Sequence, residues 1–151
     1  MTSARRPTSQ RWAVGLAAGW AGGLLCIAAL AAPAAFAVLP SAEAGRVVGR
    51  LLVQETNVSM ALALLLFFIE QRRARRAAES GRGSVLTTET LLLLGTLFCT
   101  IVGAFVVQPQ MAAARIGQGG WSFGAFHAAA GALYALKTLL VVALAWRFSR
   151  F

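Results

Sequence analysis

The sequence predicts an all-α integral membrane protein, an antiparallel four-helix bundle with both termini in the cytoplasm. Three observations predict it: an apolar composition, four long apolar stretches, and an uneven distribution of arginine. Of the 151 residues, 58% are hydrophobic and 13% are charged, whereas a soluble domain is about one quarter charged. A soluble fold of this size cannot bury so much apolar surface, so we expect lipid to cover it.

Each of the four stretches reaches the roughly 20 apolar residues needed to cross a hydrocarbon core. We expect spans at about 12–39, 48–69, 87–107 and 126–146, in one domain that covers residues 1–151. Lipid cannot satisfy backbone amides, so each span should be helical, and the continuous runs exclude a β-barrel. Pro33 predicts a kink or an early exit in the first span, and Pro109 is expected to help end the third.

Arginine placement predicts the orientation. Three arginines flank the second and fourth spans on one side, namely Arg46, Arg50 and Arg115, and ten lie on the other. The positive-inside rule therefore places both termini and the loop 70–86 in the cytoplasm of a bacterial inner membrane. The ten are Arg5, Arg6, Arg11, Arg72, Arg73, Arg75, Arg76, Arg82, Arg147 and Arg150.

The arginine-rich segment 71–79 is expected to extend the second helix into the headgroups, until Ser80 to Ser84 break it. Its arginines either control topology alone or bind anionic lipid headgroups. The net charge of +9 does not point to nucleic acid, because the basic residues flank apolar runs without interleaved aromatic side chains. The residues in question are Arg72, Arg73, Arg75 and Arg76.

Gly15, Gly19 and Gly23 recur at four-residue spacing in the first span. This spacing places them on one helix face, where small residues let another helix approach closely. We therefore expect a helix-packing face there. The alternative is that glycine is simply common in membrane helices.

Polar side chains in three spans fall in the outer leaflet, where a function that uses buried polar groups would lie. The candidate site residues are Gln54, Glu55, Asn57, Gln108, His127, Tyr134 and Lys137. A charged lysine near mid-membrane costs about 2.5–3.5 kcal/mol on insertion scales. Helix rise places Lys137 only ~6 Å deeper than Glu55, so we expect the two to form an ion pair inside the bundle. Alternatively, Lys137 snorkels alone toward the inner interface.

No GxSxG, P-loop, HExxH or GxGxxG motif occurs in the strand–helix context that such motifs require, and aspartate is absent. One histidine excludes bis-histidine haem ligation within the chain, and Cys26 and Cys99 lie singly in apolar runs as small fillers. We therefore expect a protein that is not an enzyme, with no cofactor and no metal site.

Several segments, taken in order, resemble a bacterial domain-of-unknown-function family of small four-helix membrane proteins, related to transmembrane-protein-205-like proteins. The resemblance covers about Gly15 to Trp146 and implies a membrane protein of undefined activity, with motif positions at Pro33, Phe36, Ala44, Gly45, Gly49 and His127. The chain departs from the pattern after Gly49, where many relatives carry an aromatic-rich Phe-Pro-x-Tyr segment. The segments are Ala32-Pro33-Ala34-Ala35-Phe36, Leu39-Pro40, Ala44-Gly45-Arg46-Val47-Val48-Gly49-Arg50, Phe98-Cys99-Thr100, Gln108-Pro109 and Phe123-Gly124-Ala125-Phe126-His127.

Three functions remain open. The first is a non-enzymatic bundle that associates with itself or with another membrane protein, in keeping with the glycine face. The second is a small oligomeric transporter or permeation element that uses the outer polar cluster. The third is a metal- or haem-associated redox module, since the family also resembles copper-resistance-type four-helix membrane proteins.

Overall fold

The computed structural model describes residues 8–81, 84–118 and 120–150, so Arg5, Arg6 and Arg82 lie outside the described residues. Within these ranges every regular element is a helix, which confirms the predicted all-helical class. The elements are α1 (Thr8–Cys26), η1 (Ile27–Ala31), α2 (Ala32–Val38), α3 (Ser41–Glu79), α4 (Thr88–Ile101), η2 (Val102–Val107), α5 (Gln108–Arg115) and α6 (Phe123–Arg150).

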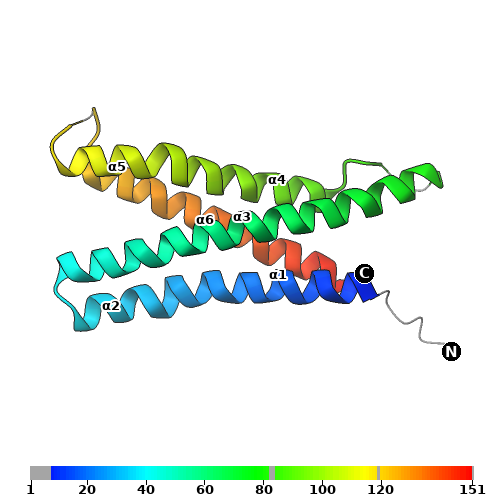
Figure 1. The fold of residues 1–151 in the computed structure, drawn as a ribbon, viewed down its shortest axis with the longest axis horizontal. Coiled ribbons are helices and arrows are strands. Elements are labelled where there is room, and N and C mark those ends of the chain that lie inside the picture. The colour runs from blue at the N-terminus through cyan, green and yellow to red at the C-terminus, as the bar shows by residue number, and fades with distance from the viewer. Residues whose placement is uncertain (1–7, 82–83, 119, 151) are drawn as a thin grey trace.

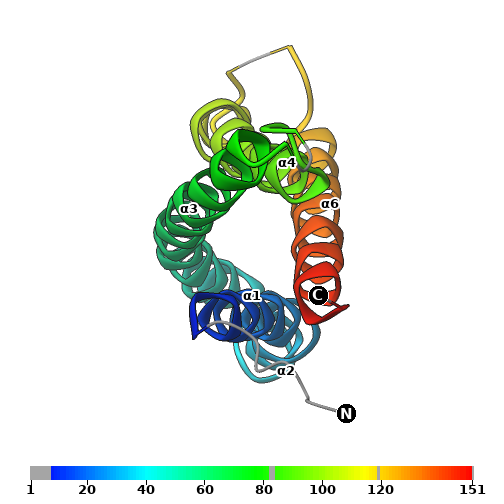
Figure 2. The same ribbon diagram turned by 90° about the vertical axis from the view of Figure 1, so that its right-hand side faces the viewer.

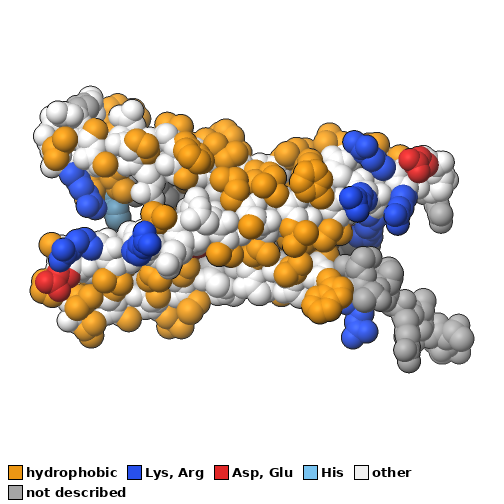
Figure 3. Space-filling view, viewed as in Figure 1, with side chains coloured by type: hydrophobic (Ala, Val, Ile, Leu, Met, Phe, Trp, Pro, Cys, Tyr) orange, Lys and Arg blue, Asp and Glu red, His pale blue; other side chains and the backbone are white. Residues whose placement is uncertain are grey.

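These elements join into four continuous helical units: α1–η1–α2, α3, α4–η2–α5, and α6. Each unit of the described chain is long and apolar enough to cross a membrane. Large apolar side chains such as Leu30, Phe68, Phe105 and Leu139 are exposed on the outside of the bundle. Figure 3 shows this apolar surface along the length of the molecule, with basic side chains near both ends. The chain is therefore a multi-pass membrane protein.

The four units pack side by side around a ring, which Figure 2 shows end-on. α1 packs against α6, α6 against α4, α4 against α3, and α3 against α1. α3 and α6 thus face each other across the ring. We call the end where α1 begins and α6 ends the closed end, and the end where α2 and α5 end and α3 and α6 begin the open end (Figure 1).

Two units contain a π-helical segment that ends just before a proline. The Ala32 amide donates to the Ile27 carbonyl in η1, and the Gln108 amide donates to the Gly103 carbonyl in η2. A proline cannot donate an amide proton, and its ring crowds the carbonyl four residues earlier, so widening the preceding turn relieves the clash. Pro33 and Pro109 therefore explain both segments.

The expectation that Pro109 would help end its helix was wrong. The chain stays helical through Pro109 as far as Arg115, because proline is tolerated in the first turn of α5 once η2 has widened. Likewise, the first unit makes no early exit at Pro33 and continues to Val38.

The long α3 continues through the arginine-rich segment and ends at Glu79, as predicted. Ser80 and Gly81 follow, and Gly81 has φ 71°, a left-handed conformation that favours glycine. All four arginines of this segment are exposed, and Arg73 lies 3.7 Å from Glu70. Thr87 then starts α4 by accepting a hydrogen bond from the Thr90 amide at 3.1 Å.

Tight apolar packing fills the half of the ring nearest the closed end. Leu66, Leu93, Val141 and Leu144 come from three units and are fully buried, and Phe148 packs with them. Polar contacts add to this half: Arg147 Nε donates to Glu89 Oε1 at 2.7 Å, and Thr87 Oγ1 donates to Glu70 Oε1 at 3.2 Å. The closed end is thus filled, which leaves the open half to hold a site.

Candidate functional site

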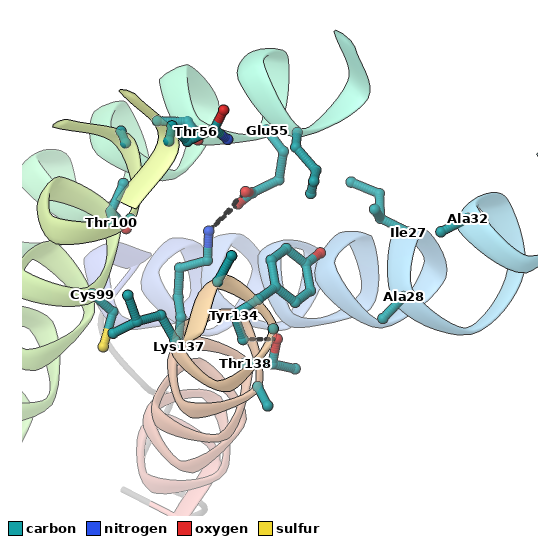
Figure 4. Close-up of a pocket in the computed structure, with 18 of the residues that line it drawn as sticks. Ile27, Ala28, Ala32, Glu55, Thr56, Cys99, Thr100, Tyr134, Lys137 and Thr138 are labelled. Carbon is teal, nitrogen blue, oxygen red and sulfur yellow. Dashed lines mark hydrogen bonds and ion pairs between the residues drawn. The ribbon is translucent and has the colours of Figure 1, made fainter. Parts of the chain in front are cut away.

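Glu55 on α3 and Lys137 on α6 meet inside the ring, as predicted. The lysine Nζ donates to Glu55 Oε1 at 2.8 Å and to Oε2 at 2.7 Å, and Figure 4 shows the contact between the two helices. Only 6% of the lysine side chain and 7% of the glutamate side chain are exposed. A buried charge is costly unless it is paired and hydrogen-bonded, and here each charge compensates the other.

Two further side chains extend this pair to the first unit. Ser59 Oγ donates a hydrogen bond to Glu55 Oε1, and Trp20 Nε1 donates to Ser59 Oγ at 2.8 Å. The network Lys137–Glu55–Ser59–Trp20 therefore joins α6, α3 and α1. Sequence reasoning missed Trp20, although a tryptophan in mid-helix, away from the membrane interfaces where this residue type is enriched, was a usable signal.

A cavity of about 590 Å³ lies between the four units on the open-end side of the ion pair. Its walls are mostly apolar, and Glu55 and Lys137 line it together with His127, Gln108 and Tyr134. Ten residues of α6 separate His127 from Lys137, which corresponds to ~15 Å along the helix. The volume is in the range of sites that hold small organic ligands.

Both π-helical segments contribute to the cavity wall. Ile27 and Ala28 come from η1, and Gly103 and Ala104 come from η2. Gly103 and Gly131 face open space, since a Cβ added at either would meet nothing within 4 Å. The wide turns and the small residues thus keep this half of the ring from filling, unlike the closed half. π-Helical turns are found disproportionately at functional sites.

The cavity also opens sideways, between α3 and the third unit. α3 packs against α4 nearer the closed end, but α3 and α5 separate toward the open end (Figure 1). Figure 3 shows the surface hollowed between these two elements. Val48 and Leu52 on α3 and Gln108 and Met111 on the third unit are among the residues that line the cavity.

Polar groups around the ion pair already have partners, but they keep some hydrogen-bonding capacity. Tyr134 donates its hydroxyl to the Leu24 carbonyl at 2.9 Å, and the Lys137 ammonium lies 5.0 Å from the Tyr134 ring centroid. Thr100 Oγ1 and Thr138 Oγ1 each donate to a carbonyl of their own helix at 2.8 Å. Their hydroxyl oxygens can still accept a hydrogen bond from a bound molecule.

The structure brings five of the seven predicted site residues to this cavity, namely Glu55, Gln108, His127, Tyr134 and Lys137. His127 is exposed near the open end, where its ring stacks on Phe123 with the centroids 5.9 Å apart.

The structure does not bring Gln54 and Asn57 to this cavity. Both are exposed on the outside of α3, because they lie about a quarter-turn or more from Glu55 on the helix.

A second, shallower groove of about 440 Å³ runs between α1 and α3. Gly15, Gly19 and Gly23 line it, and Gln54 and Val58 line its other side. A Cβ added at any of the three glycines would meet nothing within 4 Å. No helix in the described part of the chain therefore makes the close approach expected at this glycine face.

Metal ligands are not clustered in the described ranges, where no group of three or more His, Cys, Asp or Glu side chains is placed to hold an ion. Cys99 lines the cavity as a buried free thiol, and Cys26 is exposed on α1. Neither cysteine lies in a set of ligands that a transition metal would require.

Comparisons with known proteins give a family and no activity. Neither a curated protein nor a solved structure matches the chain. The family model of a domain of unknown function, DUF4149, matches residues 15–119, which hold most of the first helical unit, all of the second and third, Glu55 and most of the cavity wall. This match confirms the resemblance to a domain-of-unknown-function family, and it spans well over half of the 151 residues. The chain therefore belongs to the DUF4149 family.

Proposed function

We propose that the four units form an antiparallel bundle in a bacterial inner membrane, with the closed end and both termini in the cytoplasm. The arginine distribution supports this orientation, because Arg72, Arg73, Arg75 and Arg76 extend from the closed end and Arg147 lies in the last turn of α6 at the same end. In this orientation the exposed arginines of α3 reach anionic lipid headgroups, and the cavity opens in the outer leaflet.

Impermeant maleimide labelling of single cysteines tests the orientation, in a variant whose Cys26 and Cys99 are replaced by alanine. Arg75→Cys should react only after the cells are permeabilised, whereas Gln118→Cys should react in intact cells. The opposite pattern would reverse the proposed topology.

For the function itself, we propose a non-enzymatic membrane protein that binds a small, predominantly apolar molecule in the outer half of the bundle. One observation carries this proposal: an apolar cavity of about 590 Å³ lies between all four units, with a neutralised ion pair at its inner end. Glu55 and Lys137 form an ion pair with each other, an arrangement that favours the binding of a ligand over proton transfer. Transport across the membrane would additionally require the packed closed end to open.

Photolabelling tests binding. Alkyl probes that carry a diazirine in the chain would be added to the protein in lipid nanodiscs, and the labelled peptides would be mapped. We expect saturable labelling of α4, η2 and α6 at cavity positions. Gly131→Leu and Gly103→Leu should abolish it, because their side chains would extend into open space in the cavity.

Ala132→Leu is the matched control, since this exposed neighbour of Gly131 does not line the cavity. If neither Gly131→Leu nor Gly103→Leu reduced the labelling by any of the probes, the proposed function would be defeated.

A second candidate function is self-association through the groove between α1 and α3. Its support is the glycine face, which no helix of the same chain covers in the described ranges, and Gln54 beside it. An amide both donates and accepts hydrogen bonds, so Gln54 side chains from two copies can pair with each other in lipid. Crosslinking in membranes should yield a dimer that Gly19→Leu removes and Ala18→Leu, an exposed position outside the groove, retains.

A further inference from the structure

The charge balance at the inner end of the cavity restricts what the cavity can hold. We infer that the bound molecule is electrically neutral, with a long apolar body and one hydroxyl or carbonyl group that lies beside the Glu55–Lys137 pair. The inference rests on the proposed function and names the class of ligand for the same cavity.

Neutrality follows from the geometry of the pair. Both Glu55 oxygens accept hydrogen bonds from the Lys137 ammonium, at 2.8 and 2.7 Å, so the two charges cancel at the inner end. A third charge brought to this depth would have no compensating partner among the residues that line the cavity, and a buried unpaired charge is strongly disfavoured. An anion would have to displace Glu55, and a cation would have to displace Lys137.

A neutral polar head group can be satisfied where a charged one cannot. An ammonium has three N–H donors, and Lys137 uses two of them on Glu55. The third can donate to a hydroxyl or carbonyl oxygen of a ligand. A ligand hydroxyl can in turn donate to the oxygen of Thr100 or Thr138, which lie near Lys137 in Figure 4.

The rest of the cavity fits an apolar body. Ile27, Leu52, Ala104 and Leu133 are among the apolar residues that line it. The hollow between α3 and α5 in Figure 3 lies on the outer surface of the bundle, where large apolar side chains are exposed. A long-chain molecule can therefore enter the cavity from the lipid with its polar end leading. Its alkyl chain then stays in an apolar environment throughout.

Three diazirine-labelled probes with the same alkyl chain test the charge: a long-chain alcohol, an alkyl sulfonate and an alkyl trimethylammonium. Each would be titrated against the wild-type protein in nanodiscs of uncharged phosphatidylcholine. The alcohol should saturate the cavity at a concentration at least about tenfold lower than either charged probe, a difference that corresponds to about 1.4 kcal/mol.

The variant Glu55→Gln should change the order in which the three probes bind. Without its carboxylate the Lys137 charge is uncompensated, so the order should change and the sulfonate should bind best. Glu43→Gln is the control, because Glu43 is an exposed carboxylate in the first turn of the same helix, and it should keep the wild-type order.

The outcomes are distinct. A wild-type protein that prefers the sulfonate or the ammonium probe would overturn the inference of a neutral ligand and leave the binding function standing. The same holds for an order that Glu55→Gln does not change. Absence of saturable labelling by all three probes would instead defeat the binding function. The wild-type comparison decides the question even if Glu55→Gln fails to fold.

Discussion

Lys137 holds both carboxylate oxygens of Glu55 across the interior of the helix ring, although the two residues are 82 positions apart in the chain. α3 and α6, which carry them, lie on opposite sides of the ring. The pair therefore joins helices that apolar packing does not bring together at this level. It also forms the boundary between the packed closed half and the open cavity.

Removing one partner of this pair should destabilise the fold more than removing both. Lys137→Met or Glu55→Leu alone leaves a buried charge without a partner, which costs about 3–5 kcal/mol. The double variant leaves no buried charge and should recover most of that loss. Reversible unfolding in detergent measures the three free energies, with Glu43→Gln as an exposed control. This account would be contradicted if the double variant had a free energy of unfolding no higher than that of the less stable single variant.

The Ser59 hydroxyl should stabilise the fold through hydrogen bonds to two partners at once. Ser59→Ala removes the donor to Glu55 and leaves Trp20 Nε1 buried without an acceptor, so we expect a loss of about 1–2 kcal/mol. Trp20→Phe removes one hydrogen bond but leaves Ser59 bound to Glu55, so its hydrogen-bonding cost should be smaller. Unfolding free energies of the two single variants and the double variant form the test. Strictly additive losses would show that the two hydrogen bonds do not form one network.

The four helical units and the central ion pair could be predicted from the sequence, because each depends on a strong local constraint. Lipid requires long apolar helices, and a lysine at mid-membrane requires a partner at a similar depth, which left Glu55 as the candidate. Depth along a helix follows from residue number alone, and this is why the pairing of Glu55 with Lys137 could be anticipated.

The direction in which each residue faces was harder to predict. Gln54 and Asn57 lie at the same depth as Glu55 but point to the outside of α3, because the order of helices around the ring decides which face is internal. The cavity itself depends on η1 and η2, and sequence periodicity cannot show whether a helix bends, widens or ends at a proline. Pro109 illustrates this, since the helix widens before it and then continues.

The contact between Arg147 and Glu89 should make a small contribution that depends on salt. Their side chains are 35% and 9% exposed, and Arg147 Nε donates to Glu89 Oε1 at 2.7 Å. Screening by solvent limits such a pair to about 1 kcal/mol or less. Glu89→Gln should lower stability slightly at low salt and less at high salt. Glu79→Gln, an exposed carboxylate at the end of α3, should show no such dependence.

Pro109 should set the width of the cavity through η2. In Pro109→Ala the ring no longer crowds the Phe105 carbonyl, and the restored amide can donate to it, so an ordinary α-helical turn can replace the π-helical one. That change rotates Gly103 and Ala104 relative to Gln108 and alters the cavity wall. We expect a variant that is at least as stable as the wild type, because proline is the poorest helix former. Binding of the long-chain alcohol probe should nevertheless weaken severalfold. Pro109→Gly also lacks the ring, but glycine favours a helix less than alanine does, so comparing the two variants separates the effect of the ring from that of helix propensity. Unchanged binding of the probe in both variants would show that η2 does not shape the site.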